Sequence, residues 1–228
     1  MKNKIFVLIS FLLFFAEYSK SSELQNITDL PVILTPAQKG SSSNYLIFLF
    51  SGDGGWKEFD QQLANVFAAK GSPVVAINSL KYFWSYKSPQ QTASDTEKLL
   101  KKYTAQFKKD KIILIGYSFG ADVIPFVYNQ LPSDLKKNID SVAMLSPSAG
   151  TDFAIHVSEL LNFPTTKRKY NVADEVRRMN LTPVCFFGKD DEHSSLSSYK
   201  KICSCYILDG EHHYTIKGIE IIAKTLLP

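Results

Sequence analysis

The sequence predicts an α/β fold, with a mainly parallel sheet, helices on both of its faces and no large inserted cap. Three observations predict it. Strand-like apolar runs alternate with segments of helical period along the chain, which is typical of a parallel sheet covered by helices. A glycine-flanked serine stands at one strand-to-helix junction. The 228 residues, less a leader at the N-terminus, have a length that suits one domain.

Residues 1–21 are predicted to be a secretory signal peptide. Lys2 and Lys4 precede an apolar run at 5–16, and small polar residues follow at 19–22. This order is typical of a secretory signal, and the apolar run is too short to span a bilayer comfortably. We therefore expect residues 22–228 to form a single domain outside the cytoplasm, which is the periplasm if the source is a Gram-negative bacterium.

The first elements of the domain follow from the periodicity of apolar residues. Residues 45–50 predict a buried strand. Apolar side chains then recur at helical spacing, at Phe59, Leu63, Val66 and Phe67. They predict an amphipathic helix at 58–69, which Gly71 ends. The apolar run at 73–78 predicts the next strand.

Ser88 and Pro89 mark the start of the next helix, because serine caps a helix and proline fits its first turn. This helix is predicted to run to about residue 107. The remaining elements are predicted as strands at 112–115, 141–145, 183–187 and 202–208, a helix from about residue 121, a variable stretch at 150–180 and a closing helix at about 215–227.

The most informative stretch is Gly116-Tyr117-Ser118-Phe119-Gly120, between an apolar run and a helix-like segment. A strand that turns abruptly into a helix strains its central residue, and the positions two before and two after it must be small. Both are glycine here. The pattern predicts a nucleophile elbow that exposes the Ser118 hydroxyl above the sheet, with the positive end of the helix dipole at the reacting centre.

An acid and a histidine follow in the chain order of an α/β hydrolase. The turn at 188–192 follows a predicted strand, and we choose Asp191 as the carboxylate that orients the histidine, with Asp190 as the alternative. His212 and His213 follow the last strand. We choose His212 as the general base, because the residue after it commonly packs inward as a bulky group. The other histidines are expected at the surface or in packing: His156 and His193.

The glycine-rich segment 51–56, after the first strong strand, is predicted to complete an oxyanion hole. The intermediate of ester cleavage needs two hydrogen-bond donors about 3 Å from the oxyanion. One is predicted to be the amide of Phe119, and the second the amide of Asp53 or Gly54. The sequence thus predicts a serine hydrolase that cleaves a carboxylic ester.

Side chains near this site indicate what it binds. The residues expected to contact the substrate are Gly54, Trp56, Tyr117 and Asp122. Acidic residues on or beside the converging loops are Asp53, Asp60, Asp122, Glu192 and Glu211. Such a border would attract an ammonium group, although acidic residues also favour turns and helix starts. Tyr82, Phe83 and Trp84 are expected either to form an apolar wall or to belong to the core.

The net charge argues against a nucleic-acid partner. The formal charge is +4, and loss of the signal peptide removes three lysines and one glutamate, which leaves about +2. Nucleic-acid binding would require lysines and arginines clustered on one face. The basic clusters at 108–111 and 167–169 are expected on solvated surface or against an anionic membrane.

Three cysteines leave an odd thiol in an oxidising compartment: Cys185, Cys203 and Cys205. Either a disulfide from Cys185 to the next strand leaves one cysteine free, or all three are buried and reduced. The spacing of the histidines and cysteines matches no zinc site. We expect no metal and no cofactor.

Four segments together resemble the VirJ family of bacterial virulence proteins, which is related to the C-terminal half of AcvB. They are SGDGGW at 51–56, SLKYFW at 79–84, GYSFGAD at 116–122 and DFAIHV at 152–157. The resemblance covers about residues 30–227. It implies a periplasmic protein of α/β-hydrolase fold, linked to virulence and type IV secretion. The AcvB branch hydrolyses lysyl-phosphatidylglycerol.

The expected function is hydrolysis of aminoacyl-phosphatidylglycerol, most specifically the lysyl ester, by Ser118, His212 and Asp191. Peripheral membrane contact and contact with secretion-system components are expected interactions. Two other functions stay open: a non-catalytic periplasmic adaptor of a type IV secretion system, and a generic esterase or thioesterase. An adaptor has no reason to keep three groups in catalytic order, so labelling by a fluorophosphonate would separate it from an enzyme.

Overall fold

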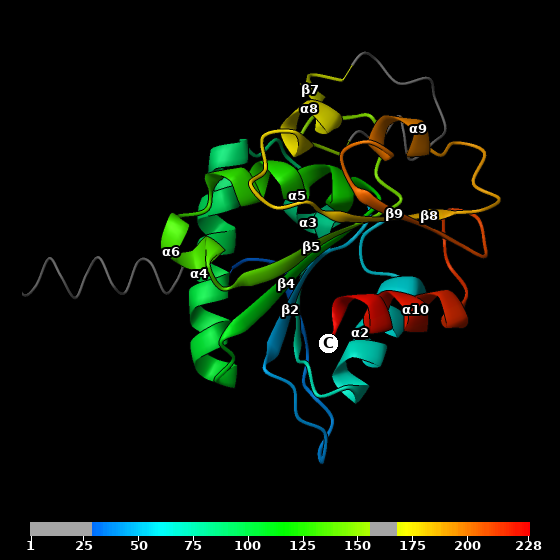
Figure 1. Cartoon of the computed structure of the whole chain (residues 1–228). Coiled ribbons are helices and arrows are strands. Elements are labelled where there is room, and N and C mark those ends of the chain that lie inside the picture. The colour runs from blue at the N-terminus through cyan, green and yellow to red at the C-terminus, as the bar shows by residue number, and fades with distance from the viewer. Residues whose placement is uncertain (1–28, 156–167) are drawn as a thin grey trace, which may run out of the picture. The chain divides into compact units, whose positions relative to one another are not determined.

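The computed structural model of the chain describes residues 29–155 and 168–228 (Figure 1). The predicted signal peptide at 1–21 and His156 lie outside the described residues. The central strands are mainly apolar. Tyr45–Phe50, for example, has five consecutive buried residues, which is expected when helices cover both faces of a parallel sheet.

Seven strands form the main sheet, in the order β1-β3-β2-β4-β5-β8-β9. Their bounds are β1 Val32–Thr35, β2 Tyr45–Phe50, β3 Val74–Ile77, β4 Lys111–Tyr117, β5 Ile139–Leu145, β8 Val184–Gly188 and β9 Ser204–Leu208. All neighbouring pairs are parallel except β1 and β3. β4 is central, with six residues in register with β2 and six with β5. The carboxyl ends of the parallel strands therefore meet at one edge of the sheet.

Long helices cover both faces of this sheet. α4 (Pro89–Phe107) and α5 (Phe119–Gln130) lie on one face, and α2 (Glu58–Ala69) and α10 (Ile216–Leu226) lie on the other (Figure 1). The side chains of Ser88 and Thr215 cap α4 and α10, because each hydroxyl accepts a hydrogen bond from a backbone amide of the first turn. The connections contain α3 Ser79–Tyr82, α6 Ser133–Lys136, α8 Val172–Val176, α9 Leu196–Tyr199 and the paired strands β6 Gly150–Thr151 and β7 Tyr170–Asn171.

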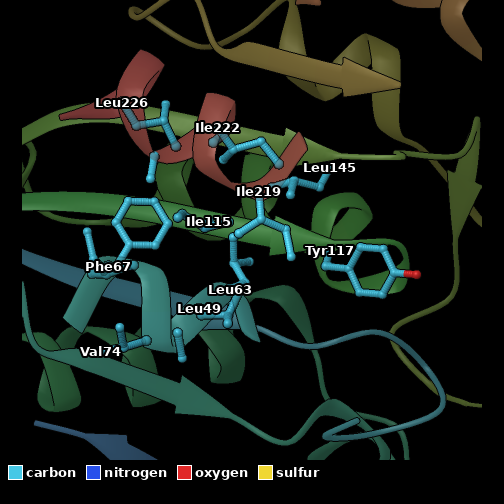
Figure 2. Close-up of a cluster of buried hydrophobic side chains, with 14 of the residues drawn as sticks. Leu49, Leu63, Phe67, Val74, Ile115, Tyr117, Leu145, Ile219, Ile222 and Leu226 are labelled. Carbon is cyan, nitrogen blue, oxygen red and sulfur yellow. The ribbon is translucent and has the colours of Figure 1, made fainter. Parts of the chain in front are cut away.

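One hydrophobic core joins α2 and α10 to the sheet (Figure 2). Its labelled members are all buried: Leu49, Leu63, Phe67, Val74, Ile115, Tyr117, Leu145, Ile219, Ile222 and Leu226. Burial of one such side chain stabilises the fold by about 1.5–3 kcal/mol. Tyr117, the last residue of β4, belongs to this core, so the core reaches the edge where the predicted catalytic residues stand.

The predicted fold class is confirmed, and the helix predicted at 58–69 has the same bounds as α2. The prediction missed β1, a four-residue edge strand that is only half-buried. It also missed α3, a single turn that Asn78 caps by accepting from the amide of Lys81 at 3.2 Å. Both elements are too short to show a period. The variable stretch at 150–180 contains β6, β7 and α8.

The three cysteines are free thiols. Cys185 of β8 is buried and stands in register with Cys205 of β9, whereas Cys203 comes just before β9. Cys203 and Cys205 are only half-buried. Neither expectation therefore holds in full, because these residues form no disulfide and only one of the three is buried.

Candidate active site

Ser118 stands between the last residue of β4 and the first residue of α5. Its φ is 50° and its ψ is −118°, a conformation that costs a non-glycine residue on the order of 1–3 kcal/mol. A Cβ added to Gly116 would lie 2.3 Å from the carbonyl oxygen of Gly120, and one added to Gly120 would lie 2.3 Å from that of Phe50. The backbones approach too closely here for any side chain, which explains why both positions are glycine.

Three side chains form a hydrogen-bonded chain at this edge of the sheet. The Ser118 hydroxyl lies 2.8 Å from His212 Nε2, and His212 Nδ1 lies 3.0 Å from Asp191 Oδ2. Asp191 follows β8 and His212 follows β9. The other oxygen of Asp191 accepts from the amide of His193 at 3.0 Å, which holds the carboxylate in place. With the carboxylate on Nδ1, Nε2 is free to accept the proton of Ser118.

The sequence left two alternatives open, Asp190 or Asp191 and His212 or His213, and the structure distinguishes between them. Asp190 is exposed, and its amide donates to the carbonyl oxygen of Gly210 at 3.1 Å. The ring of His213 lies 5.6 Å from the rings of Phe59 and Tyr117, centroid to centroid. Burial lowers the pKa of His213, which favours its neutral form. It is Asp191 and His212 that the structure brings to Ser118.

The glycine-rich loop at 51–56 passes beside Ser118. A Cβ added to Gly52 would lie 3.3 Å from the ring of Tyr117 and 3.6 Å from the Cβ of Ser118. The amide of Gly54 already donates to Oδ1 of Asp53 at 2.8 Å. Within the described part of the chain, the amides of Asp53 and Phe119 donate no hydrogen bond. Of the two loop amides that the sequence suggested, that of Asp53 is therefore the one available to an oxyanion.

A cavity of about 570 Å³ opens at Ser118. It is lined by Gly52, Asp53, Gly54, Gly55, Lys57, Asp60, Tyr117, Ser118, Asp191, His193, His212 and His213. Gly54 and Tyr117, both predicted to contact the substrate, are among them. Sequence reasoning missed Lys57 and expected His193 at the surface or in packing. His193 is exposed and also lines the cavity. Proximity to the glycine-rich loop was the only available signal for Lys57.

Two other residues that the sequence predicts to contact the substrate, Trp56 and Asp122, are not among the lining residues of this cavity. Trp56 packs against the hydrophobic core, and its Nε1 donates to Gln61 Oε1 at 3.1 Å. Asp122 is buried, and its two oxygens accept from Ser148, one from the amide at 2.7 Å and the other from the hydroxyl. Burial raises the pKa of Asp122 to about 7. The Asp122 carboxyl therefore anchors the segment after β5.

Asp60, by contrast, has one carboxylate oxygen without a partner. Its Oδ2 accepts from the amide of Lys57 at 2.9 Å, at the start of α2. Its Oδ1 is buried and has no hydrogen-bond partner among the described residues. Burial raises the pKa of Asp60 to about 6, although its bond with the Lys57 amide acts in the opposite direction. Because an unpartnered buried carboxylate is costly, a donor entering the cavity would stabilise Asp60.

Only part of the predicted acidic border reaches the cavity. Asp53 and Asp60 line it, whereas the exposed residues Glu192 and Glu211 do not. Lys57 adds one cation to the lining. The negative charge is therefore concentrated on the side of the cavity formed by the glycine-rich loop and the start of α2.

The predicted aromatic wall is not part of this lining either. Tyr82 is buried, and its hydroxyl donates to Asp95 Oδ2 at 2.7 Å. Phe83 is fully buried, with its ring centroid 5.0 Å from that of Phe119. Trp84 is 63% exposed. The segment thus splits into two core residues and one surface residue.

The chemistry available at Ser118 comes from a hydroxyl, an imidazole, carboxylates and backbone amides. Across residues 29–155 and 168–228, no group of three His, Cys, Asp or Glu side chains is placed to hold a metal ion. In the same residues, no helix has both the length and the apolar character needed to cross a membrane.

Comparison with protein families identifies a related family. The model of a family described as Bacterial virulence protein (VirJ) matches residues 44–228. The matched range includes the glycine-rich loop, the elbow at Ser118 and the turns that carry Asp191 and His212. No curated protein matches this chain significantly.

Solved structures share the fold. The esterase domain of a Rhodothermus marinus protein has a TM-score of 0.60 and 14% identity, covering 86% of this chain and 90% of its own. A hydrolase from Oleispira antarctica has a TM-score of 0.62 and 12% identity, covering 89% and 96%. An alpha-beta serine hydrolase homologue from Coxiella burnetii has a TM-score of 0.57 and 15% identity, covering 86% and 88%. At these identities the likeness shows the α/β-hydrolase fold alone.

Proposed function

This chain belongs to the VirJ family of bacterial virulence proteins and has the α/β-hydrolase fold, and we propose that it is a periplasmic serine hydrolase that cleaves a carboxylic ester. One observation carries the proposal. Ser118, on a strained elbow, lies within hydrogen-bond distance of His212, which in turn contacts Asp191. Nucleophilic catalysis requires a hydroxyl, a base and a group that orients the base, in this geometry.

The first half of the reaction forms an acyl-enzyme. Ser118 Oγ attacks the ester carbonyl carbon while His212 Nε2 takes its proton, and Asp191 stabilises the imidazolium through Nδ1–H. The amides of Asp53 and Phe119 bind the oxyanion, and each such donor lowers the barrier by roughly 3 kcal/mol. The intermediate then expels the alcohol oxygen, to which His212 returns the proton.

The second half releases the acid. His212 takes a proton from water as the water oxygen attacks the carbonyl carbon of the Ser118 ester, and the same two amides hold the second oxyanion. Collapse of this intermediate breaks the bond to Ser118 Oγ, and the proton on His212 passes to that oxygen. Ester and water have become acid and alcohol, and the enzyme is restored.

The substrate that we propose is an aminoacyl ester of phosphatidylglycerol, most specifically the lysyl ester. Asp53 and Asp60 place two carboxylates in the cavity of Ser118, and Oδ1 of Asp60 has no partner among the described residues. An aminoacyl ammonium group supplies the donors and the positive charge that these oxygens require. The periplasmic location and a link to virulence and type IV secretion belong to the same proposal. The resemblance to the family and the signal-like sequence at 1–21 support them.

Two assays on the purified mature protein test the proposal. A fluorophosphonate probe should label the protein at Ser118, and the Ser118→Ala variant should stay unlabelled. The protein should also release lysine from lysyl-phosphatidylglycerol in detergent micelles, with Ser118→Ala as the control.

Each outcome selects one function. Labelling without lysine release, together with cleavage of small neutral esters or thioesters, would favour a generic esterase or thioesterase. Failure of both labelling and turnover, in a folded protein, would favour the non-catalytic adaptor.

A further inference from the structure

A surface beside the site combines exposed aromatic rings with lysines. Trp84 is 63% exposed and Tyr86 is 51% exposed, and Ser85 between them is exposed as well. Large aromatic side chains usually lie in the core. Two of them exposed within three residues, directly after the buried pair Tyr82 and Phe83, therefore call for an explanation.

Two lysines flank these rings in the chain, and a third lies over one of them. Lys81 and Lys87 flank them in the chain, and the segment 79–90 has no acidic residue. Lys169 lies over two rings, with Nζ 5.6 Å from the Tyr86 centroid and 5.1 Å from the Tyr170 centroid. The hydroxyls of Tyr86 and Tyr170 lie 3.0 Å apart. We call Lys81, Trp84, Tyr86, Lys87, Lys169 and Tyr170 the aromatic-basic surface.

Contacts with both sides of the oxyanion hole fix the position of this surface. On one side, a Cβ added to Gly55 of the glycine-rich loop would lie 3.0 Å from Leu80. On the other, the buried ring of Phe83 packs on that of Phe119. The backbone is tied to the segment before β7, because the amide of Lys87 donates to the carbonyl oxygen of Phe153 at 3.0 Å. The rings therefore stand on a supported segment next to the site.

We propose that the aromatic-basic surface docks on the surface of an anionic phospholipid bilayer. Tryptophan and tyrosine favour the headgroup region, since their rings are apolar and their N–H and O–H groups remain hydrated. Lysines beside them are attracted to anionic headgroups. The strength of interfacial binding grows with the apolar area that is buried and with electrostatic attraction to anionic lipids, and this surface offers both. Such docking would deliver a lipid ester to Ser118, and this purpose rests on the proposed function. The experiment measures membrane binding alone.

Vesicle sedimentation tests the proposal, and the Ser118→Ala protein is used so that no lipid is consumed. It should bind vesicles of phosphatidylglycerol and phosphatidylcholine mixed equally, and bind pure phosphatidylcholine at least tenfold more weakly. Raising the salt from 0.1 M to 0.5 M should weaken binding severalfold, because salt screens exposed charges. Equal, salt-insensitive binding to both vesicles would overturn the proposal. Absence of binding to either would do so as well.

Matched variants locate the binding surface. Charge reversal by Lys81→Glu with Lys169→Glu should weaken binding more than tenfold, since each lysine contributes roughly fivefold. The same reversal at Lys200 and Lys201, both exposed and outside the surface, should change it little. Trp84→Ala should weaken binding severalfold, whereas Tyr206→Ala, at a ring that is 42% exposed, should not. Circular dichroism checks that each variant folds, and equal effects in both pairs would disprove the assignment.

Tryptophan fluorescence gives a second readout. The chain has two tryptophans, so in a Trp56→Phe protein the emission reports on Trp84 alone. This emission should shift to shorter wavelength with anionic vesicles and stay unchanged with soluble oligosaccharides. If Trp56→Phe does not fold, loss of the shift in Trp84→Phe gives the same information. A shift with sugars alone would reassign the rings to carbohydrate binding. Binding that persists while labelling and turnover fail would overturn the proposed hydrolase and leave this inference standing.

Discussion

Two helices begin beside the cavity, and each has a buried aspartate in its first turn. The two aspartates differ in their hydrogen bonds. In α5, Asp122 has both oxygens bonded to Ser148. In α2, Asp60 has one oxygen bonded to the Lys57 amide and one without a partner. Sequence reasoning gave both residues the same role on the acidic border. Both aspartates are buried, so the difference between them is in hydrogen bonding: Ser148 satisfies Asp122, whereas one oxygen of Asp60 has no partner among the described residues.

The two adjacent histidines contact residues at the starts of these two helices, one at each. His212 reaches Ser118 at the start of α5, whereas the ring of His213 packs on Phe59 in the first turn of α2. We therefore assign the bond-making groups to the start of α5 and substrate recognition to the start of α2. Each assignment can be broken separately.

Removal of the nucleophile should have the largest effect. Ser118→Ala should reduce ester turnover by at least about 10⁴-fold, because the residues of a catalytic triad act as a unit. The melting temperature should change little, since alanine must adopt the same strained φ. Turnover is measured with a chromogenic ester and folding by thermal denaturation. Undiminished turnover in a folded variant would refute the role proposed for α5.

Substitution of His212 should have the second largest effect on turnover, and that of His213 a much smaller one. His212→Ala should cost nearly as much turnover as loss of Ser118, since the base and the nucleophile work together. His213→Ala should cost less than about tenfold, because its ring contacts Phe59 and Tyr117 and not the reacting atoms. Steady-state kinetics of the two variants decide the matter, and the reverse ranking would move the base to His213.

The structural role of Asp122 predicts a loss of stability. Asp122→Ala should lower the free energy of unfolding by about 3 kcal/mol, because it removes both hydrogen bonds that the buried carboxyl accepts from Ser148. Asp122→Asn should lose much less, because its side-chain carbonyl oxygen can still accept from the Ser148 amide. Urea denaturation of both variants gives the comparison. Equal losses would argue against the anchoring role.

For Asp60 the effect on stability should have the opposite sign and depend on pH. Its pKa is raised in the folded protein to about 6, so the unfolded chain loses this proton first as the pH rises from about 4 to 6. Parent stability therefore falls through this window. Relative to the parent, Asp60→Asn should gain up to about 2–3 kcal/mol above pH 6 and little at pH 4. Melting curves against pH measure the difference, and a difference independent of pH would contradict it.

The smallest expected effect is on substrate binding by Asp60 at the start of α2. Asp60→Asn should raise KM for an aminoacyl ester about tenfold, since loss of one charged hydrogen bond costs about 1.5 kcal/mol, and leave KM for a neutral ester of the same size nearly unchanged. For the parent, KM for the cationic ester should rise as the pH falls below about 6. The two esters are assayed side by side with Glu211→Gln, which lies outside the cavity, as the control. Equal changes for both esters would remove Asp60 from recognition.

The sequence allowed the long elements and the order of the site to be predicted, because both depend on local signals. The elbow requires glycine at 116 and 120, and the acid and the histidine follow strand ends in a fixed chain order. What it could not show was the partner of each buried polar group. The hydrogen bonds of Asp122 come from Ser148, a residue 26 positions away, and no sequence pattern near Asp122 predicts that contact.

The aromatic segment shows the same limit. Tyr82, Phe83 and Trp84 are consecutive, and α3 ends at Tyr82. Because α3 is a single turn, no period shows which ring faces inward. Phe83 is buried because its ring packs on those of Phe50, Phe119 and Phe153, all distant in the chain, whereas Trp84 is exposed. Trp56 likewise has a partner that no local pattern indicates, Gln61, which lies one turn into α2.

The central place of β4 has a consequence for how the protein loses activity on heating. Ser118 is the residue after a strand that is paired along its length on both sides, so its backbone has no local route to a relaxed conformation. Amides of such strands exchange with solvent mainly when the whole domain opens. The backbone geometry of Ser118 therefore belongs to the same cooperative unit as the sheet, and the elbow is expected to be lost only when the domain melts.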